Sequence, residues 1–189
     1  MKLILASTSK YRREQLQKLS YEFEAVAPEY DEEVLKQSGL SLINLSSELA
    51  LGKAVSLKKR YPESYIIGSD QIAHLGELRL SKPGNFVRAS EQLALMAGKT
   101  HTLTTSVAIV GPDNFQTLFT NQTHLKMRTL TNAEIESYLK LDTPFDCAGS
   151  YKIESFGISL FEAIETTDFT AIIGLPLLEL AKELRTIAH

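Results

Sequence analysis

The sequence lacks the features of a secreted or membrane-embedded protein. Its 189 residues include a single cysteine, Cys147, so no disulfide can form within the chain, which fits a reducing compartment. The apolar run near the N-terminus covers only residues 3–6, which is too short for a secretory signal core. No stretch approaches the roughly 20 apolar residues of a membrane span. We therefore expect a cytoplasmic protein that does not enter a membrane.

Several functional classes are also disfavoured. Lysine and arginine total 20 against 23 acidic residues, a net charge of −3, and the absence of a basic excess argues against a nucleic-acid partner. The net charge does not exclude a small phosphorylated ligand, because such a ligand needs only a local group of cations. There is no phosphate-binding GxxxxGK motif followed by Ser or Thr. Cys147 is interpreted as a buried structural thiol. The histidines lack metal-ligand spacing with one another: His74, His101, His124 and His189.

The pattern of apolar residues predicts an α/β fold with a mixed sheet. Strands are expected at residues 2–6, 21–27 and 65–72, with a hairpin at 100–110 and 115–127. Helices are expected at residues 10–19, 42–60 and 90–97. Another helix is expected to begin at residue 131, and a separate last helix is expected to end at about residue 187. The acidic residues 28–39 are expected to form turns. Because no linker rich in Pro, Gly or Ser divides the chain, we expect one domain over residues 1–189.

A polar elbow joins the first strand to the first helix. Ser7 and Ser9 precede Arg12 and Arg13, so a helix start with free N–H groups, hydroxyls and a guanidinium is available to a phosphate. Plain helix capping, with the arginines in solvent, explains the same residues. Consecutive helix residues point about 100° apart, so Arg12 and Arg13 should not both reach one phosphate.

Four charged residues elsewhere are candidates for a site. Asp70 ends the clearest strand, where ligands gather in open α/β sheets, and its carboxylate can hold a divalent cation, accept a proton from water, or cap a turn. Lys53 interrupts the apolar stripe of its helix and must either extend outward or meet an anion. Glu32 and Lys82 lie in polar segments, where solvated side chains are the ordinary outcome.

Taken together, these segments resemble the Maf-like nucleotide pyrophosphatases along the whole chain. The matching segments are LASTSKYRR at 5–13, GSDQ at 68–71, KP at 82–83, DCAGSYKIE at 146–154 and IGLPL at 173–177. The resemblance implies a bent, mixed sheet flanked by helices in two lobes with a central cleft, a fold related to inosine-triphosphate pyrophosphatases. The family usually has proline where this chain has Lys10, a change with little consequence at a helix start.

The resemblance also implies the roles of the charged residues. Asp70 matches the catalytic acid of the family, taken as the proton acceptor, and with Glu32 it would hold a divalent cation, Mg²⁺ or Mn²⁺. The other matching positions would bind the triphosphate of a nucleotide substrate: Ser7, Ser9, Arg12, Lys53 and Lys82. A homodimer is what the family suggests.

Three positions indicate the branch of the family. Tyr11, Gln71 and Glu154 resemble the branch that hydrolyses 7-methyl-GTP to 7-methyl-GMP and pyrophosphate, and so removes non-standard nucleotides. An aromatic face at Tyr11 attracts the cationic methylated base, although this side chain can also simply pack on the surface, and Glu154 can accept hydrogen bonds from the guanine edge. The alternatives are a dTTP/UTP pyrophosphatase of the same family and a non-enzymatic, nucleotide-binding regulator of cell division. An RNA cap-binding protein is disfavoured by the lack of a basic excess.

Overall fold

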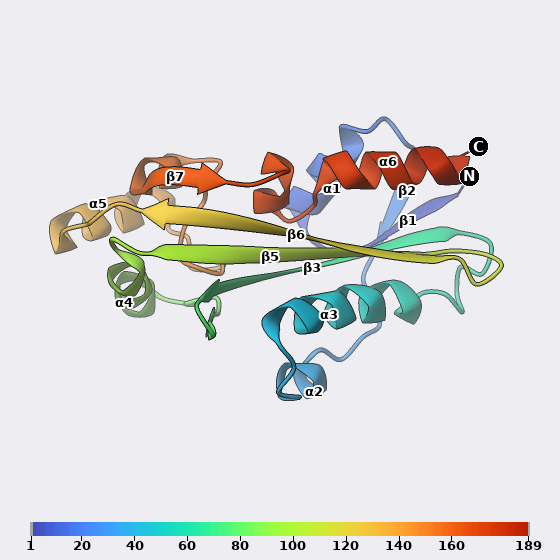
Figure 1. The fold of residues 1–189 in the computed structure, drawn as a ribbon, viewed down its shortest axis with the longest axis horizontal. Helices are drawn as coiled ribbons and strands as arrows, with labels where there is room; N and C mark the ends of the chain where they lie inside the picture. Colours follow the sequence, from blue (N-terminus) through green and yellow to red (C-terminus); the bar gives the residue numbers. More distant parts are fainter. Residues whose placement is uncertain (1, 189) are drawn as a thin grey trace. The chain divides into compact units, whose positions relative to one another are not determined.

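The computed structural model describes residues 2–188, so Met1 and His189 lie outside it. Seven strands form one sheet in the order β2-β1-β3-β5-β6-β7, with β4 paired to β3 (Figure 1). Strand β1 pairs in parallel with β2 and β3, whereas β3–β4 and β6–β7 are antiparallel. The mixed α/β class expected from the sequence is therefore confirmed.

The strands are β1 Leu3–Ala6, β2 Phe23–Val26, β3 Tyr65–Leu75, β4 Leu78–Leu80, β5 Thr100–Val110, β6 Gln116–Met127 and β7 Phe161–Glu165. The α-helices are α1 Lys10–Gln17, α2 Glu33–Lys36, α3 Leu42–Ser56, α4 Phe86–Met96, α5 Asn132–Asp142 and α6 Leu177–Ala188, and the 3₁₀ helices are η1 Phe156–Leu160 and η2 Phe169–Ile173.

The contacts divide the chain into two compact units. The first contains the residues up to Gln71, residues 104–121 and the residues from Asp168 onward; the second contains residues 72–103 and 122–167. Strands β3, β5 and β6 each run from one unit into the other. The single domain expected over residues 1–189 stays a prediction.

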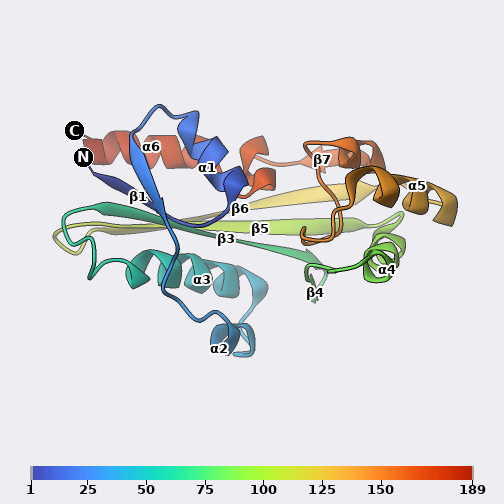
Figure 2. The ribbon, with the colours of Figure 1, turned by 180° about the vertical axis from the view of Figure 1, so that it is seen from behind.

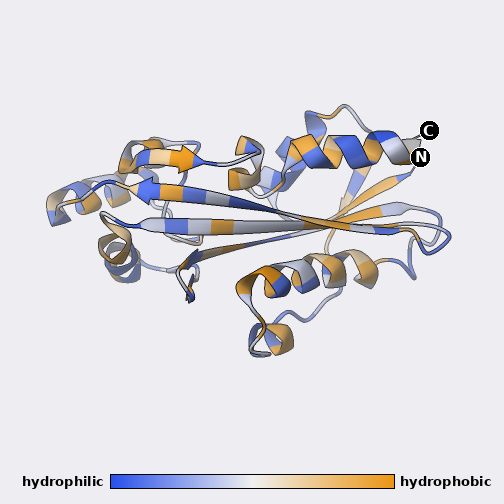
Figure 3. Ribbon diagram, viewed as in Figure 1, coloured by the Kyte–Doolittle hydropathy of each residue, from blue (hydrophilic) through white to orange (hydrophobic). Residues whose placement is uncertain are grey.

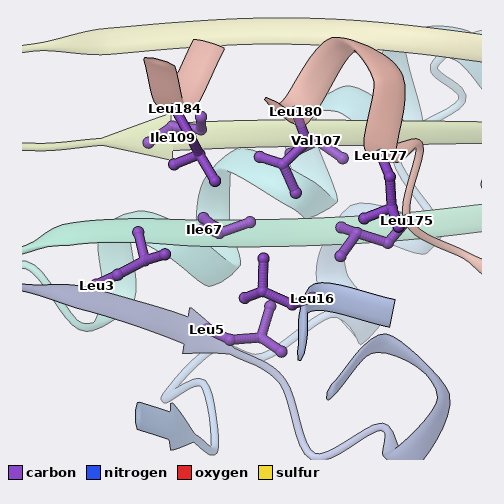
Figure 4. Close-up of a cluster of buried hydrophobic side chains, with 10 residues drawn as sticks. All are labelled: Leu3, Leu5, Leu16, Ile67, Val107, Ile109, Leu175, Leu177, Leu180 and Leu184. Atoms are coloured by element: carbon purple, nitrogen blue, oxygen red, sulfur yellow. The ribbon is translucent and has the colours of Figure 1, made fainter. Parts of the chain in front are cut away.

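The first unit has a helix layer on each face of its part of the sheet. Helix α3 covers one face, and α1 and α6 cover the other (Figures 1 and 2). Beneath α3, Ile4 and Ile66 pack against Ala50 and Leu57. On the opposite face, Figure 4 shows apolar side chains from three strands meeting those of α1, of α6 and of the segment just before α6: Leu3, Leu5, Leu16, Ile67, Val107, Ile109, Leu175, Leu177, Leu180 and Leu184. Helix α6 carries both hydrophobic and hydrophilic residues (Figure 3), and its core residues Leu177, Leu180 and Leu184 recur at the three- and four-residue spacing of an amphipathic helix.

The second unit contains β4, α4, α5, η1 and β7. Helix α5, expected from residue 131 onward, begins with a capping box, in which Thr131 Oγ1 accepts from the Glu134 N–H and Glu134 accepts from the Thr131 N–H. His101 is fully buried, lies within hydrogen-bond distance of Tyr151 Oη through Nε2 at 2.9 Å, and has a pKa lowered to about 4 by burial and by His74. It is a neutral core histidine. No helix within residues 2–188 is long and apolar enough to span a membrane.

Several local expectations need correction. Residues 28–39 include the short helix α2 and are not turns throughout. Helix α4 begins at Phe86, earlier than the expected 90, because the Asn85 side chain caps it by accepting from the Arg88 N–H at 3.0 Å. Cys147 is half-buried, not buried, and its thiol pKa is raised to about 12 by burial and by Asp146, which disfavours a thiolate nucleophile.

Candidate active site

Strand β3 presents charged and neutral side chains to opposite faces of the sheet. Gly68 and Asp70 lie two residues apart and share the face toward α3. A Cβ atom at Gly68 would come within 2.1 Å of the Ala50 carbonyl oxygen and 2.7 Å of the Ala54 nitrogen. Because Gly68 has no side chain, α3 lies directly against β3, which brings Lys53 of the helix against Asp70 of the strand.

Lys53 connects the two acids named by the sequence. Its ammonium lies 2.6 Å from Asp70 Oδ1 and 2.9 Å from Glu32 Oε1, and Glu32 Oε2 in turn contacts Lys36 at 3.0 Å. Lys53 is 7% exposed and Asp70 8%. The expectation that Lys53 meets an anion is therefore confirmed, and the alternative that it extends into solvent is wrong.

The ion pairs set the charge state of Glu32. Partial burial acts to raise its pKa, but hydrogen bonds and attraction from Lys53 and Lys36 outweigh this effect. The pKa of Glu32 is consequently below its ordinary value, and the side chain is a carboxylate at neutral pH.

The elbow after β1 has the hydrogen bonds of a capped helix start. Ser7 Oγ accepts from the Ser9 N–H at 3.1 Å, and Ser9 Oγ accepts from the Arg12 N–H at 3.4 Å. The capping interpretation is confirmed for Ser9. Since a hydroxyl both accepts and donates, each serine keeps an O–H that can be donated to an anion.

Arg12 is tied to the last segment of the chain. Its Nε donates to the Gly174 carbonyl at 3.0 Å, and Gly174 has φ +105°, where a Cβ would be strained and would lie 3.4 Å from that Nε. Burial lowers the pKa of Arg12, an effect partly offset by attraction to Asp70 and Glu32. Arg13 is exposed, so the two arginines diverge as the helical geometry requires.

The opposite face of β3 carries Ser69 and Gln71. Ser69 Oγ donates to the Gly174 carbonyl at 2.9 Å. The Gln71 amide nitrogen is surrounded by Thr105 of β5 and by carbonyl oxygens of η2. Tyr11 is half-buried in the first turn of α1.

Two predicted site residues belong to the second unit. Lys82 and Glu154 are both exposed, on the loop after β4 and on the turn before η1. The turn that carries Glu154 is held by Asp142, whose carboxylate accepts from Ser155 Oγ at 2.7 Å and the Gly157 N–H at 3.1 Å. Whether Lys82 and Glu154 join the residues of the first unit stays a prediction.

Comparison with known proteins identifies the family. The model of the family described as "Maf-like protein" matches residues 2–187. The chain belongs to the Maf-like family. A 7-methyl-GTP pyrophosphatase of Xanthomonas axonopodis pv. citri is 46% identical over 97% of this chain and 95% of the relative. Another of that name, from Bdellovibrio bacteriovorus, is 48% identical over 95% of this chain and 94% of the relative.

Solved structures share the fold at low sequence identity. The Ham1 protein of Staphylococcus aureus aligns with a TM-score of 0.56 and 13% identity, covering 98% of this chain and 99% of that one. A HAM1 protein from Coxiella burnetii aligns with a TM-score of 0.54 and 11% identity, with the same coverage. The expected relation to this group of α/β folds is confirmed.

The Maf-like chain offers oxygen ligands suited to a hard cation. Among residues 2–188 no group of three or more His, Cys, Asp and Glu side chains could hold a metal ion. Asp70 and Glu32 nevertheless contact one ammonium, and Asp70 Oδ2 has no hydrogen-bond partner in the described part of the chain. Mg²⁺ is commonly held by one or two carboxylates together with substrate phosphates and water, so this pair fits such an ion.

Three residues of this arrangement were not found from the sequence. Thr105 has no local signal, because it matters through a partner distant in the chain. Gly68 did have a local signal, because a glycine inside a strand pattern suggests the close approach of another backbone. Asp142 did have one: an acid at the C-terminal end of a helix is disfavoured by the helix dipole and therefore suggests a compensating contact.

Proposed function

We propose that this Maf-like protein hydrolyses 7-methyl-GTP to 7-methyl-GMP and pyrophosphate, and so removes a non-standard nucleotide. The observation that supports this proposal most directly is that Lys53 forms ion pairs with both Asp70 and Glu32. Arg12 is also attracted electrostatically to the same two acids. The substrate is proposed from relatives 46% and 48% identical that bear this name.

The triphosphate is proposed to bind through donors of several segments. The Ser7 and Ser9 hydroxyls and the N-terminal end of α1 supply neutral donors. Positive charge comes from Arg12 and Lys53, and from Lys82 if the second unit contributes as the resemblance implies. Such preorganised cations stabilise the charge that develops on the leaving pyrophosphate.

Asp70 is the proposed catalytic residue. Its carboxylate orients a water molecule and takes its proton as the water oxygen bonds to the α-phosphorus; the α–β anhydride bond then breaks and pyrophosphate leaves. Asp70 and Glu32 would hold the divalent cation, Mg²⁺ or Mn²⁺, which supplies Lewis-acid polarisation of the phosphates when bound.

Base selection is assigned to Tyr11, Gln71 and Glu154. Methylation at N7 gives the guanine ring a positive charge, which the face of Tyr11 attracts and a carboxylate at Glu154 complements. We further propose that the protein works in the cytoplasm with the nucleotide as its partner; a homodimer stays a prediction.

The decisive experiment identifies products from 7-methyl-GTP, GTP, dTTP and UTP with Mg²⁺, for the wild type and Asp70→Asn. We expect 7-methyl-GTP to be cleaved fastest, and the variant to lose about 10²- to 10⁴-fold in kcat, the contribution usual for a general base. Faster cleavage of dTTP and UTP would overturn 7-methyl-GTP as the substrate and favour the dTTP/UTP pyrophosphatase. Nucleotide binding without pyrophosphate release would favour the regulator, and a folded variant with the wild-type rate would refute the role of Asp70.

A further inference from the structure

The side-chain amide of Gln71 is held by its nitrogen. Nε2 donates to Thr105 Oγ1 at 2.9 Å, to the Ala171 carbonyl at 2.8 Å and to the Ile172 carbonyl at 3.1 Å. An amide nitrogen carries two hydrogens, and three acceptors occupy both of them.

These acceptors fix which way the amide faces. If the amide were reversed, Oε1 would oppose two carbonyl oxygens that cannot donate. The remaining neighbour, Thr105, is fully buried, and its hydroxyl donates to the Ala171 carbonyl at 3.1 Å. Thr105 therefore faces Gln71 with a lone pair, which favours the nitrogen and disfavours the oxygen.

The backbone acceptors are themselves fixed. Asp168 Oδ1 accepts from the Thr170 N–H at 2.9 Å and hydroxyl at 2.6 Å, while Asp168 Oδ2 accepts from the Leu178 N–H at 2.7 Å. Thr170 Oγ1 also accepts from the Leu177 N–H at 2.7 Å. These bonds join η2 to the start of α6, so the carbonyls of 171 and 172 are poorly able to rotate away from Gln71.

One polar atom of this group is left over. Oε1 of half-buried Gln71 accepts no hydrogen bond from the described part of the chain. We propose that Thr105 is a positioning residue that holds Gln71 as a hydrogen-bond acceptor toward the exocyclic amino group of the substrate base. The inference rests on the proposed function and deepens it, because it names the base atom that Gln71 selects.

The test compares 7-methyl-GTP with 7-methyl-ITP, which lacks that amino group. We expect the wild type to prefer 7-methyl-GTP. Thr105→Val keeps the shape but loses the hydroxyl, and should reduce the kcat/KM ratio of the two substrates, mainly through KM. The reduction should not exceed about fivefold, the value of one hydrogen bond, because the carbonyls of Ala171 and Ile172 still hold the amide. Thr105→Ser retains the hydroxyl and should retain the ratio. A merely structural role for Thr105 would lower both rates together and leave the ratio unchanged.

Each outcome separates the two proposals. If the wild type releases no pyrophosphate from 7-methyl-GTP, the proposed function fails and this inference fails with it. If the wild type is active but Thr105→Val leaves the ratio unchanged, only the inference is overturned. Gln71→Met covers the case in which Thr105→Val does not fold: it removes the acceptor directly, and an unchanged ratio in this variant also overturns the inference.

Discussion

The two faces of β3 use adjacent residues in different ways. On the face toward α3, Asp70 is one member of a row of alternating charges with Lys53, Glu32 and Lys36. On the other face, the Gln71 amide forms hydrogen bonds with neutral groups, namely the Thr105 hydroxyl and two carbonyls. The charged face can exchange partners when phosphates or a cation arrive, because each ion pair is replaceable by another. The neutral face keeps one hydrogen-bond arrangement, which suits selection of a base.

This contrast predicts that substitutions on the charged face lower the hydrolysis of all nucleotides alike, whereas those that reach Gln71 alter the choice between nucleotides.

The largest effect on stability is expected from Gly68→Ala. The new methyl would overlap the Ala50 carbonyl of α3, and backbone cannot rotate away as a side chain can. We expect a loss of about 3 kcal/mol in the free energy of unfolding, measured by denaturant titration. Gly39→Ala is the control: its φ is +72° but nothing lies within 4 Å of the new Cβ, so only about 1 kcal/mol of backbone strain is expected. Equal losses in the two variants would disprove the close packing of α3 on β3.

Lys53→Met comes next. It leaves Asp70 and Glu32 without their shared ammonium, and because the Glu32 side chain is 31% exposed, we discount the cost of a broken buried pair to about 2 kcal/mol. Pyrophosphate release should fall by a similar factor for every nucleotide. Lys36→Met, at the other end of the same row, removes a half-buried contact and should cost under about 1 kcal/mol. A change in nucleotide preference with Lys53→Met would contradict the division of roles between the faces.

Ser69→Ala is the smaller test on the neutral face. It removes one buried hydrogen bond to the Gly174 carbonyl, which keeps its bond from Arg12, so we expect about 1 kcal/mol lower stability by thermal unfolding. Since Ser69 does not contact the Gln71 amide, the preference among nucleotides should be unchanged. A shift as large as that of Thr105→Val would mean that the whole face, and not the Gln71 amide, sets selectivity.

The smallest effect concerns pH. The pKa of Glu32 is lowered in the folded state, so its stabilising contribution is present above the unfolded value of 4.5 and is lost as the pH falls through the lower folded value. Glu32→Gln should therefore flatten the decline of the melting temperature below about pH 4.5 relative to the wild type. Parallel curves for the two proteins would show that the ion pairs of Glu32 add no net stability.

Apolar periodicity and turn residues predicted most of the secondary structure, because these signals act between residues close in the chain. The hairpin expected at 100–110 and 115–127 corresponds to β5 and β6, and the helix expected from 131 onward corresponds to α5. Helix α4 begins before the expected residue 90, because its cap, Asn85, precedes residues with little helical pattern. For the site, the apolar stripe of α3 indicated that Lys53 either extends outward or meets an anion, but it did not decide between the two or name the anion.

What the sequence alone determined is therefore the α/β class, most elements, and the set of chemically distinctive residues at motif positions, because caps and periodicity act between residues a few positions apart. Tertiary structure alone decided that Lys53 meets Asp70, 17 positions away, and that the Gln71 amide faces Thr105 and Ala171, 34 and 100 positions away. Such contacts depend on how closely elements approach, as α3 does at Gly68, and no local pattern specifies that distance.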